Sequence, residues 1–425
     1  MIFFYFLITQ MPLDQDPTWG KFLGLATAIK YVGFVCILYA ILHVAMRGAL
    51  PRYLATVQAR IFFVFLFINF VSYWTMGPKF SIEFSPFMIY LSMTFLFFVV
   101  LSIVDTISHL RWTLLAAVAA MGWASLFMVR AWMKHPMWRP GGATGDANYF
   151  ALDACLVIPV AYLFVRRTKV LWQRGFAFAC LILTIFSTFL GGSRGGMLGL
   201  GAAFLWLLWH APRRFRNFAI LVVLITPPLL WSPFSPVRRL IHPVASDVNG
   251  EEARLIAWKA GLRMIEQHPV VGIGLGQFKP KMDIYADPGT RIDSIAHNTY
   301  LEIAAETGIP NFLVFMALLF YAYRSLSLTR RRASSTGPPL VHLAATAVQA
   351  GLIGFMVGAF FLSAEHMKLF WLWMFLSMAL PSLLSMKTGG LEDNVGQPKI
   401  SDESVSEDET LAMVGTGKQV PSFRY

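Results

Sequence analysis

Charged residues are scarce in this chain: they make up 14% of its 425 residues, while 56% are hydrophobic. A soluble protein of this length carries about a quarter charged residues. The mean hydropathy is +0.59, and apolar runs of about 17–25 residues, long enough for a helix to cross a bilayer, recur along the sequence. This composition excludes an ordinary soluble domain and predicts an all-α polytopic membrane protein.

Cysteine is also rare. The three cysteines, Cys36, Cys155 and Cys180, lie within apolar runs and show no CxxC spacing, which supports neither a disulfide framework nor a zinc site. The His, Asp and Cys residues have no metal-ligand spacing, and the sequence contains neither a P-loop nor a Ser-His-Asp pattern. We therefore expect no metal and no cofactor.

Acidic residues are fewer than basic ones, and the formal net charge is +12. The basic residues form short clusters between apolar runs, which is the positive-inside pattern of membrane proteins and not a nucleic-acid surface. Alternate loops are basic, and we predict that these are cytoplasmic; they contain Arg47 to Arg60, Arg111, Arg166 to Arg174, Arg213 to Arg216 and Arg324 to Arg332.

Residues 1–385 form one predicted membrane domain of about twelve helices. Met1 to Thr9 is short for a span, and it has neither the basic start nor the cleavage site of a removable signal peptide. The other spans are predicted at 22–46, 60–77, 86–106, 111–131, 149–165, 175–192, 196–210, 217–233, 305–324, 341–363 and 367–385.

This layout puts both chain termini in the cytoplasm. The loops predicted to lie outside are 132–148, 191–196 and 234–304. One group breaks the charge rule, because Arg130, Lys134 and Arg139 are basic at the outer end of a span. Residues 386–425 are acidic and rich in Ser and Gly, which predicts a disordered cytoplasmic tail.

The outer loop 234–304 is the only large segment outside the predicted spans. Residues 251–267 read as an amphipathic helix, because Leu255, Trp258, Leu262 and Ile265 recur at helical spacing, and His268-Pro269 should end it. The glycines from Gly272 to Gly276 resemble a dinucleotide-binding fingerprint only superficially, since no βαβ unit surrounds them. We interpret them as a tight turn against the membrane.

Arg194 lies between two glycine pairs, in Gly191-Gly-Ser-Arg-Gly-Gly196, at the outer end of a span. Arginine within a span costs about 2.5–3.5 kcal/mol on insertion scales, which makes it a functional candidate. The alternative is an Arg194 side chain that reaches the lipid headgroups. The glycines favour anion binding for two reasons. They would let a ligand approach the backbone closely, and they would leave unpaired N–H groups at the start of a helix.

Arg254 falls at the edge of the apolar stripe of the predicted loop helix. It is either solvated at the membrane surface or a second guanidinium aimed at the same site as Arg194. Two planar guanidinium groups match the oxygens of a diphosphate better than lysines would.

His297 and Asn298 precede a new apolar segment at the outer surface, where Ser294 can cap the helix and Gly308-Ile-Pro310 can kink or end it. A histidine can accept a proton from a hydroxyl near neutral pH, so His297 is the candidate general base. Glu302 and Glu306 either orient His297 or cap and solvate the helix start; for Glu302 we favour the second interpretation.

Three polar residues open the span near 149–165. Asp146 and Asn148 lie at its outer start, and Asp153 lies about one turn into the membrane. A carboxylate at that depth needs a polar or basic partner, and Asp153 could instead give a cavity its structure.

At these residues the chain resembles the O-antigen ligase and polymerase superfamily of bacterial envelopes. The resemblance rests on Gly192 to Gly196, Arg254 to Trp258, Pro269 to Phe278 and His297 to Gly308, with a weaker match at Asp146 to Asn148. It implies a fold similar to membrane glycosyltransferases of the GT-C type, in the inner membrane, with the site facing the periplasm. Asn311 departs from the residues that ligases often carry at this position, which leaves ligase and polymerase open.

The resemblance implies a metal-independent, inverting transfer of a glycan from a polyprenyl-diphosphate carrier to a glycolipid, glycan or protein acceptor. It implies that Arg194 and Arg254 hold the diphosphate and that His297 activates the acceptor hydroxyl, with Asn298, Glu306, Asp146 and Asn148 in support. A flippase or transporter is the rival from another class. Its polar groups should lie at mid-membrane depth, whereas these candidates gather at one surface.

Overall fold

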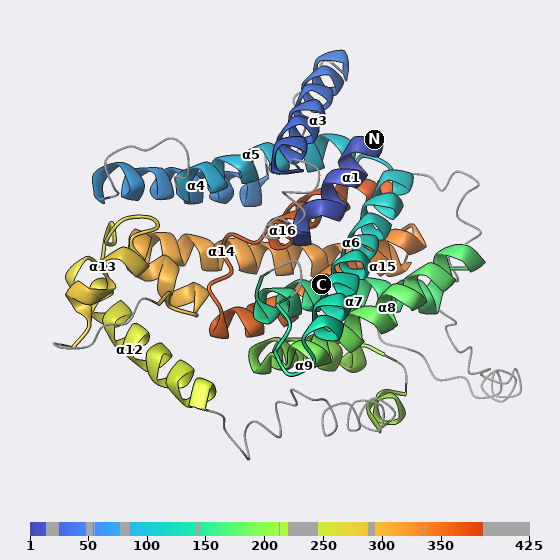
Figure 1. Cartoon of the computed structure of the whole chain (residues 1–425). Helices are drawn as coiled ribbons and strands as arrows, with labels where there is room; N and C mark the ends of the chain where they lie inside the picture. The colour runs from blue at the N-terminus through green and yellow to red at the C-terminus, as the bar shows by residue number, and fades with distance from the viewer. Residues whose placement is uncertain are drawn as a thin grey trace, which may run out of the picture.

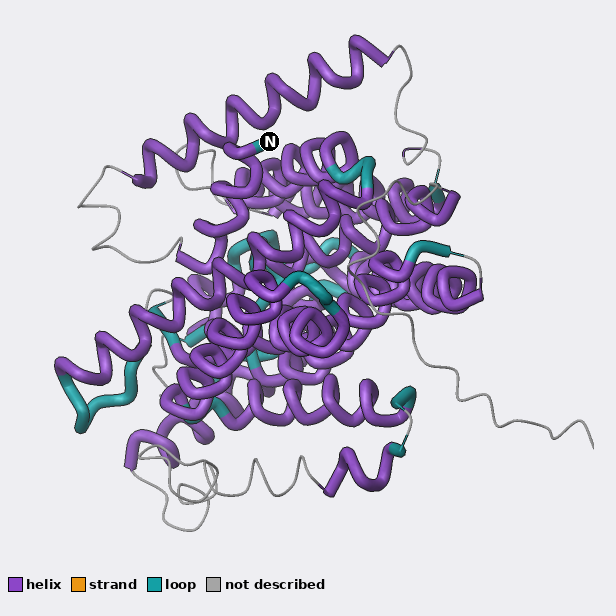
Figure 2. The backbone as a smooth tube through the Cα atoms, turned by 90° about the vertical axis from the view of Figure 1, so that its right-hand side faces the viewer, coloured by secondary structure: helices purple, strands orange, loops and turns teal. Residues whose placement is uncertain are grey.

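The computed structural model describes residues 1–13, 25–47, 54, 56–76, 86–141, 145–211, 213–219, 245–287, 294–335 and 337–385. Within these ranges the regular structure is helical and there is no strand (Figures 1 and 2). The all-α class predicted from composition is confirmed. Most of the predicted span 217–233 and the whole predicted tail 386–425 lie outside the described residues.

Most of the described helices overlap predicted spans, whereas the two at Ala245–Gln267 and Phe278–Tyr285 lie in the predicted loop 234–304. In chain order they are α1 (Ile2–Gln10), α3 (Leu25–Arg47), α4 (Val57–Met76), α5 (Pro86–Ile103), α6 (Ile107–Lys134), α7 (Ala147–Arg167), α8 (Leu171–Gly191), α9 (Arg194–Trp209), α12 (Ala245–Gln267), α13 (Phe278–Tyr285), α14 (Thr299–Ser335), α15 (Pro339–Gly358) and α16 (Lys368–Ala379). Short 3-10 helices follow α1 (η1, Met11–Leu13), α15 (η4, Ala359–Phe361) and α16 (η5, Leu380–Ser385).

Seven of these helices are long and apolar enough to cross a membrane. They are α4, α5, α6, α7, α8, α14 and α15 with its extension to Phe361. Shorter apolar helices occur at Val32–Met46, Arg194–Trp209 and Lys368–Leu384. Helix α1 has nine residues, or about 14 Å, which is half of a hydrocarbon core. The chain is therefore an integral membrane protein, and the number of twelve spans remains a prediction.

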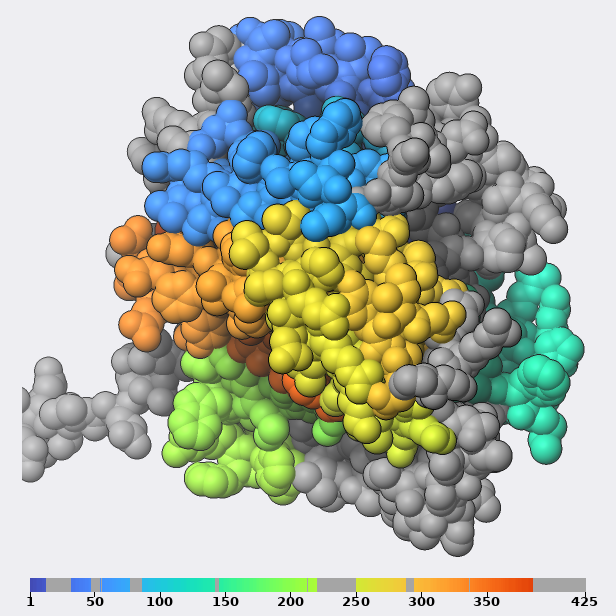
Figure 3. All heavy atoms as spheres, turned by 90° about the vertical axis from the view of Figure 1, so that its left-hand side faces the viewer, coloured from blue at the N-terminus to red at the C-terminus, as the bar shows by residue number. Residues whose placement is uncertain are grey.

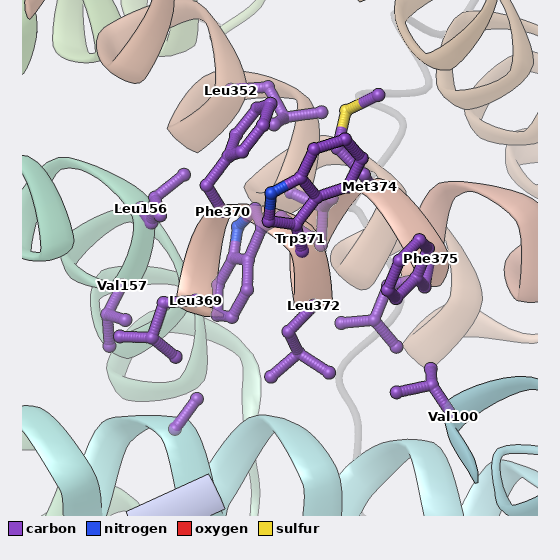
Figure 4. Close-up of a cluster of buried hydrophobic side chains, with 14 of the residues drawn as sticks. Val100, Leu156, Val157, Leu352, Leu369, Phe370, Trp371, Leu372, Met374 and Phe375 are labelled. Carbon is purple, nitrogen blue, oxygen red and sulfur yellow. The ribbon is translucent and has the colours of Figure 1, made fainter. Parts of the chain in front are cut away.

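Helix α16 lies in the core of the bundle rather than against lipid. Trp371 and Trp373 are fully buried, and Figure 4 shows Trp371 among aliphatic and aromatic side chains. Phe370 stacks on Phe355 of α15 with ring centroids 4.3 Å apart. The apolar run at 367–385 therefore encodes a buried helix, because in a membrane protein both core and lipid-facing positions are hydrophobic.

Helix α14 is kinked at Gly308, as the sequence predicted. Gly308 has φ 85° and ψ 165°, a region open almost only to glycine. The kink leaves the Ala305 and Glu306 carbonyls to accept hydrogen bonds from the Ile273 and Gly274 amides, at 2.9 and 3.0 Å. The glycine-rich segment is thus a turn packed on α14, which confirms the turn; its position against the membrane remains a prediction.

We expect Gly308→Ala to lower the unfolding temperature of the detergent-purified chain by several degrees. The backbone conformation costs about 1–3 kcal/mol for a residue with a side chain, and a Cβ atom would lie 2.2 Å from the Val270 carbonyl oxygen. Gly201→Ala is the control, since nothing lies within 4 Å of its added Cβ. An equal melting temperature for Gly308→Ala and wild type would contradict this account of the kink.

Helix α12 confirms the predicted loop helix but turns a different face to the protein. Leu255 and Leu262 are 58% and 61% exposed, while Ala257, Ala260 and Met264 are fully buried. Small residues allow close helix packing, and they displace the larger apolar residues to the exposed side. Of the predicted stripe, Leu255 and Leu262 therefore face away from the protein, while Trp258 and Ile265 are half-buried.

The loops predicted to lie outside meet at one end of the bundle. Lys281 of α13 donates to the carbonyl of Met76 at the end of α4, at 3.2 Å, and Thr299 donates to the carbonyl of Leu362, at 3.0 Å from its backbone nitrogen. Figure 3 shows α12 and α13 (yellow) over the middle of this end, between the blue helices α4 and α5 and the green segment of α9. Their common side is a structural fact; that it faces outside remains a prediction.

Candidate functional site

Arg194 is the first residue of α9, and the preceding Ser193 caps the helix. The Ser193 hydroxyl oxygen accepts from the Gly196 amide at 3.2 Å, a common way to satisfy a free amide at a helix start. The Arg194 side chain is 26% exposed and forms an ion pair with Glu251 of α12, at 2.5 Å. This contact joins α9 to the loop helix.

The glycines around Arg194 serve packing, which differs from the role that we expected for them. A Cβ atom on Gly195 would lie 2.7 Å from the Phe361 Cβ, and one on Gly196 would lie 2.3 Å from the Ala151 Cβ. Gly192 ends α8 in the left-handed conformation, with φ 55°. The protein itself approaches this backbone, so α9 starts tightly against α7 and η4.

Asn148 links the start of α7 to the start of α9. Its Oδ1 atom accepts from the Ser193 hydroxyl at 2.8 Å and from Arg139 Nη2 at 2.9 Å. Arg139 also donates through Nε to the carbonyl of Gly191, at 2.5 Å. Asp146 caps α7 and accepts from the Asn148 amide at 2.7 Å. The predicted pair Asp146 and Asn148 therefore lies beside Arg194.

Three arginines share this end of the bundle. Partial burial, and then the charge of Arg194, lower the pKa of Arg254, while Asp146 and Glu251 act in the opposite direction. The pKa of Arg139 is lowered in the same way by desolvation, with Arg254 and Arg194 contributing and Asp146 opposing. Arginine stays charged through such shifts, so the cluster concentrates positive charge opposite two carboxylates.

His297 has an unusual backbone and an unsatisfied ring atom. Its φ is 48°, a left-handed conformation that is uncommon outside glycine and that histidine adopts more often than most residues. Its Nδ1 atom is buried and has no hydrogen-bond partner among the described residues. Burial, and then the nearby Arg254, lower the pKa of His297, while Asp146 acts to raise it. The imidazole is therefore neutral at pH 7.

Two side chains fix the residue before His297. The carbonyl of Ala296 accepts from Trp258 Nε1 at 2.9 Å, and its amide bonds to the Glu302 carboxylate. Glu302 also accepts from the Ser363 hydroxyl, and it is 7% exposed. The solvated role that we favoured for Glu302 was wrong, because this carboxylate is buried and helps to hold the His297 loop in place.

Two predicted supporting residues have structural contacts of their own. The Asn298 side chain caps α14, since its Oδ1 accepts from the Tyr300 and Leu301 amides at 3.0 and 3.1 Å. Ser294, the predicted cap, lies too far upstream of Thr299, where α14 begins. The Glu306 carboxylate accepts from the amides of Gly276 and Phe278 at 2.7 and 2.9 Å and so holds the glycine turn.

The structure thus brings Arg194, Arg254 and His297 together with Asp146 and Asn148, and it keeps Asn298 and Glu306 in the frame behind them. Sequence reasoning did not select three further residues of the site: Arg139, Glu251 and Trp258. Arg139 had a signal, since it is one of the basic residues that break the charge rule on this side. Trp258 was named only as part of the apolar stripe and of the Arg254 to Trp258 motif, and Glu251 gave no signal apart from its closeness to Arg254.

Comparison with known proteins gives one match to part of this chain. A family model described as O-antigen ligase matches residues 179–316, a stretch that runs from α8 into α14 and contains Arg194, Arg254 and His297. No curated protein matches the chain. The match confirms the resemblance carried by the sequence motifs over these residues, which are similar to the O-antigen ligase and polymerase superfamily.

Proposed function

We propose that this chain is a metal-independent, inverting glycosyltransferase of the inner membrane. It transfers a glycan from a polyprenyl-diphosphate carrier to an acceptor hydroxyl on the outer face, as an O-antigen ligase does. The family match supports ligase- or polymerase-like activity. The donor, the acceptor and the direction of the site are part of the proposal.

The observation that carries the proposal is the placement of Arg194, Arg254 and Arg139 beside a neutral His297 at one end of the bundle. When the bond between the anomeric carbon and the diphosphate oxygen breaks, negative charge grows on the leaving group. Fixed guanidinium groups stabilise that charge without needing to reorganise. Their planar donors also match phosphate oxygens in pairs.

His297 takes the proton of the acceptor hydroxyl as the acceptor oxygen attacks the anomeric carbon from the face opposite the diphosphate. The attack inverts the configuration of that carbon. A base has to be unprotonated before the step, and the lowered pKa of His297 meets this requirement at pH 7. The anchored Ala296 and the left-handed backbone at His297 keep the imidazole in one place.

Mass spectrometry of envelope glycans from cells with and without the gene tests this function. Without the chain, we expect the linked glycan to be lost and the polyprenyl-diphosphate-linked glycan to accumulate. An unchanged glycan profile would contradict the proposal. If cells without the gene lose only the transfer of whole glycans to the acceptor, the chain is a ligase. If they lose the series of longer lipid-linked chains, it is a polymerase.

The rate should depend on pH in a way that reports the neighbours of His297. We expect kcat/KM to fall at acid pH with a midpoint below 6.5, because the protonated imidazole cannot accept a proton and its pKa is lowered. Arg254→Gln removes a positive neighbour and should move the midpoint upward. Asp146→Asn keeps a capping side chain and should move it downward. If neither variant moved the midpoint, the fall of kcat/KM at acid pH would not report the protonation of His297.

The Glu251 carboxylate is paired with the Arg194 guanidinium in this structure. It should therefore compete with an incoming diphosphate. An exposed ion pair contributes about 0–1 kcal/mol, so Glu251→Gln should tighten binding of inorganic pyrophosphate up to about fivefold. Titration calorimetry on the purified chain measures this, with the exposed Glu266→Gln on the same helix as control. Weaker binding by Glu251→Gln would show that the carboxylate supports the site instead of competing for it.

A further inference from the structure

A polar cavity lies near the arginine cluster, at the same end of the bundle. Its volume is about 300 Å³, within the range of sites that hold small ligands. Its walls come from α7, from residues 363–369 between η4 and the first turn of α16, and from η1 and α5. The polar side chains that line it are Tyr149, Asp153, Ser363, His366 and Lys368.

Asp153 gives the main indication that the cavity binds a ligand. The residue is 5% exposed, and its Oδ1 atom is buried without a hydrogen-bond partner among the described residues. A buried polar atom without a partner is costly, and a carboxylate lining a cavity can recover that cost by accepting from a ligand hydroxyl. The polar or basic partner that we expected for Asp153 is therefore not found at Oδ1 among the described residues, and a ligand in the adjoining cavity could supply one.

His366 also lines the cavity, and it has a second buried atom without a partner. Its Nδ1 atom pairs with Glu365 Oε1 at 2.8 Å, which fixes the ring, while Nε2 is buried and has no partner among the described residues. An imidazole oriented by a carboxylate can offer its other nitrogen to a hydroxyl group. Asp153 and His366 thus place two unpartnered polar atoms beside the cavity, in residues that line different walls.

The lining fits a sugar ring better than an ion. An anion would meet the Asp153 carboxylate as well as the Lys368 ammonium group, and the carboxylates and histidines of the described residues form no group that could hold a metal. A sugar ring has hydroxyl groups around its edge and C–H groups on its faces. The hydroxyl groups match Asp153, Ser363 and His366, and the faces match an aromatic ring such as that of Tyr149.

The cavity shares its walls with the frame of the candidate site. Tyr149 directly follows Asn148, which contacts Arg139 and Ser193. The amide of Ala364, also in the wall, donates to Thr299 Oγ1 at 2.8 Å, and Thr299 lies two residues after His297. A sugar in the cavity would therefore be held by the same segments that hold the base and the arginines.

We propose that this cavity is a sugar subsite, which binds one ring of a glycan substrate through Asp153 and His366. The inference rests on the proposed glycosyl transfer and extends it by naming where a sugar ring binds. Either the donor glycan or the acceptor glycan can supply the ring, since both offer the same hydroxyl chemistry.

Saturation-transfer NMR on the detergent-purified full chain tests the subsite with glucose, galactose and N-acetylglucosamine, each at about 10 mM, as suits weak binding. We expect transfer to at least one sugar. Asp153→Asn and, separately, His366→Gln should each weaken that binding about tenfold, while the exposed Glu266→Gln leaves it unchanged. Absence of transfer to all three sugars, or binding unaffected by both site variants, would overturn the subsite.

Pyrophosphate titration of the same preparations separates the subsite from the diphosphate site. Asp153→Asn should bind pyrophosphate as the wild type does. Sugar binding without pyrophosphate binding supports the subsite while it contradicts the diphosphate role of the arginines. Pyrophosphate binding without sugar binding overturns the subsite alone.

Transfer assays in membranes supplied with separate donor and acceptor fractions identify the source of the ring. Asp153→Asn should raise the KM for the fraction whose sugar the cavity binds and leave the other KM unchanged. A rise for neither fraction, with wild-type kcat, would overturn the proposal.

Discussion

Replacing His297 by Ala should reduce glycan transfer by about 10²- to 10⁴-fold, the contribution typical of a positioned general base. The lipid-linked donor should still bind and should accumulate in cells, because Arg194 and Arg254 remain. His297→Gln separates two roles of the side chain, since glutamine donates and accepts hydrogen bonds but cannot take up a proton at neutral pH. It should fail as completely as His297→Ala if the role is proton transfer.

The matched control is His135→Ala, which changes an exposed histidine at the end of α6. It should transfer at the wild-type rate. Protein level and monodispersity in detergent must be equal in all variants before the rates are compared. Full transfer by a well-expressed His297→Ala would remove the base assignment, and partial transfer by His297→Gln would limit the side chain to positioning the acceptor.

Replacing Arg194 by Lys should lower kcat/KM about 10- to 100-fold. The substitution keeps the charge but loses the planar pair of donors that fits phosphate oxygens, and a hydrogen bond to a charged group contributes about 1.5–3 kcal/mol. Arg254→Lys should behave similarly, and the double variant should lose less than the two effects multiplied, because both side chains contact one diphosphate. Rates measured with equal amounts of inserted protein check this.

Arg263→Lys is the control for these arginine variants. Arg263 also lies on α12, but it pairs with Asp287 at 2.5 Å and belongs to the support of the loop. Its substitution should leave the rate unchanged. Near-normal activity of Arg194→Lys would return Arg194 to a side chain that only reaches lipid headgroups.

The helices of this protein were predictable because a helix that crosses a membrane needs an apolar run of about 20 residues, which can be seen in the sequence. The kink at Gly308 was predictable as well, since a glycine two residues before a proline inside an apolar run marks a break in the helix. What apolar runs do not encode is which face meets protein and which meets lipid. For this reason the apolar stripe predicted for α12 did not show that Ala257 and Ala260 would be buried while Leu255 and Leu262 are exposed.

The candidate site was predictable in its chemistry but not in its geometry. Arg194, Arg254 and His297 stood out because ionisable residues at a membrane surface need a reason to be there. The left-handed backbone of His297 left no mark in the sequence, because it is imposed by the contacts of Ala296 with Trp258 and Glu302. The contact with Trp258 joins residues 38 positions apart in the chain, and no local pattern reports it.

Arg139 is an exception to the positive-inside rule, and the exception pointed to the candidate site. The charge rule assigns basic residues to the cytoplasmic side, and Arg139 was an exception without an explanation. In the structure it donates to Gly191 and Asn148 and lies within the electrostatic reach of Arg194 and Arg254. An anion-binding role would explain a basic residue on this side better than topology does.

Reconstitution of the purified chain tests the central proposal most directly. Proteoliposomes would contain the chain, a polyprenyl-diphosphate-linked glycan and an acceptor glycolipid, with a metal chelator present throughout. The account predicts that the glycan becomes covalently attached to the acceptor with inverted anomeric configuration, that one polyprenyl diphosphate is released for each glycan transferred, and that His297→Ala does neither. Movement of the intact lipid-linked glycan across the bilayer without any new glycosidic bond would contradict it.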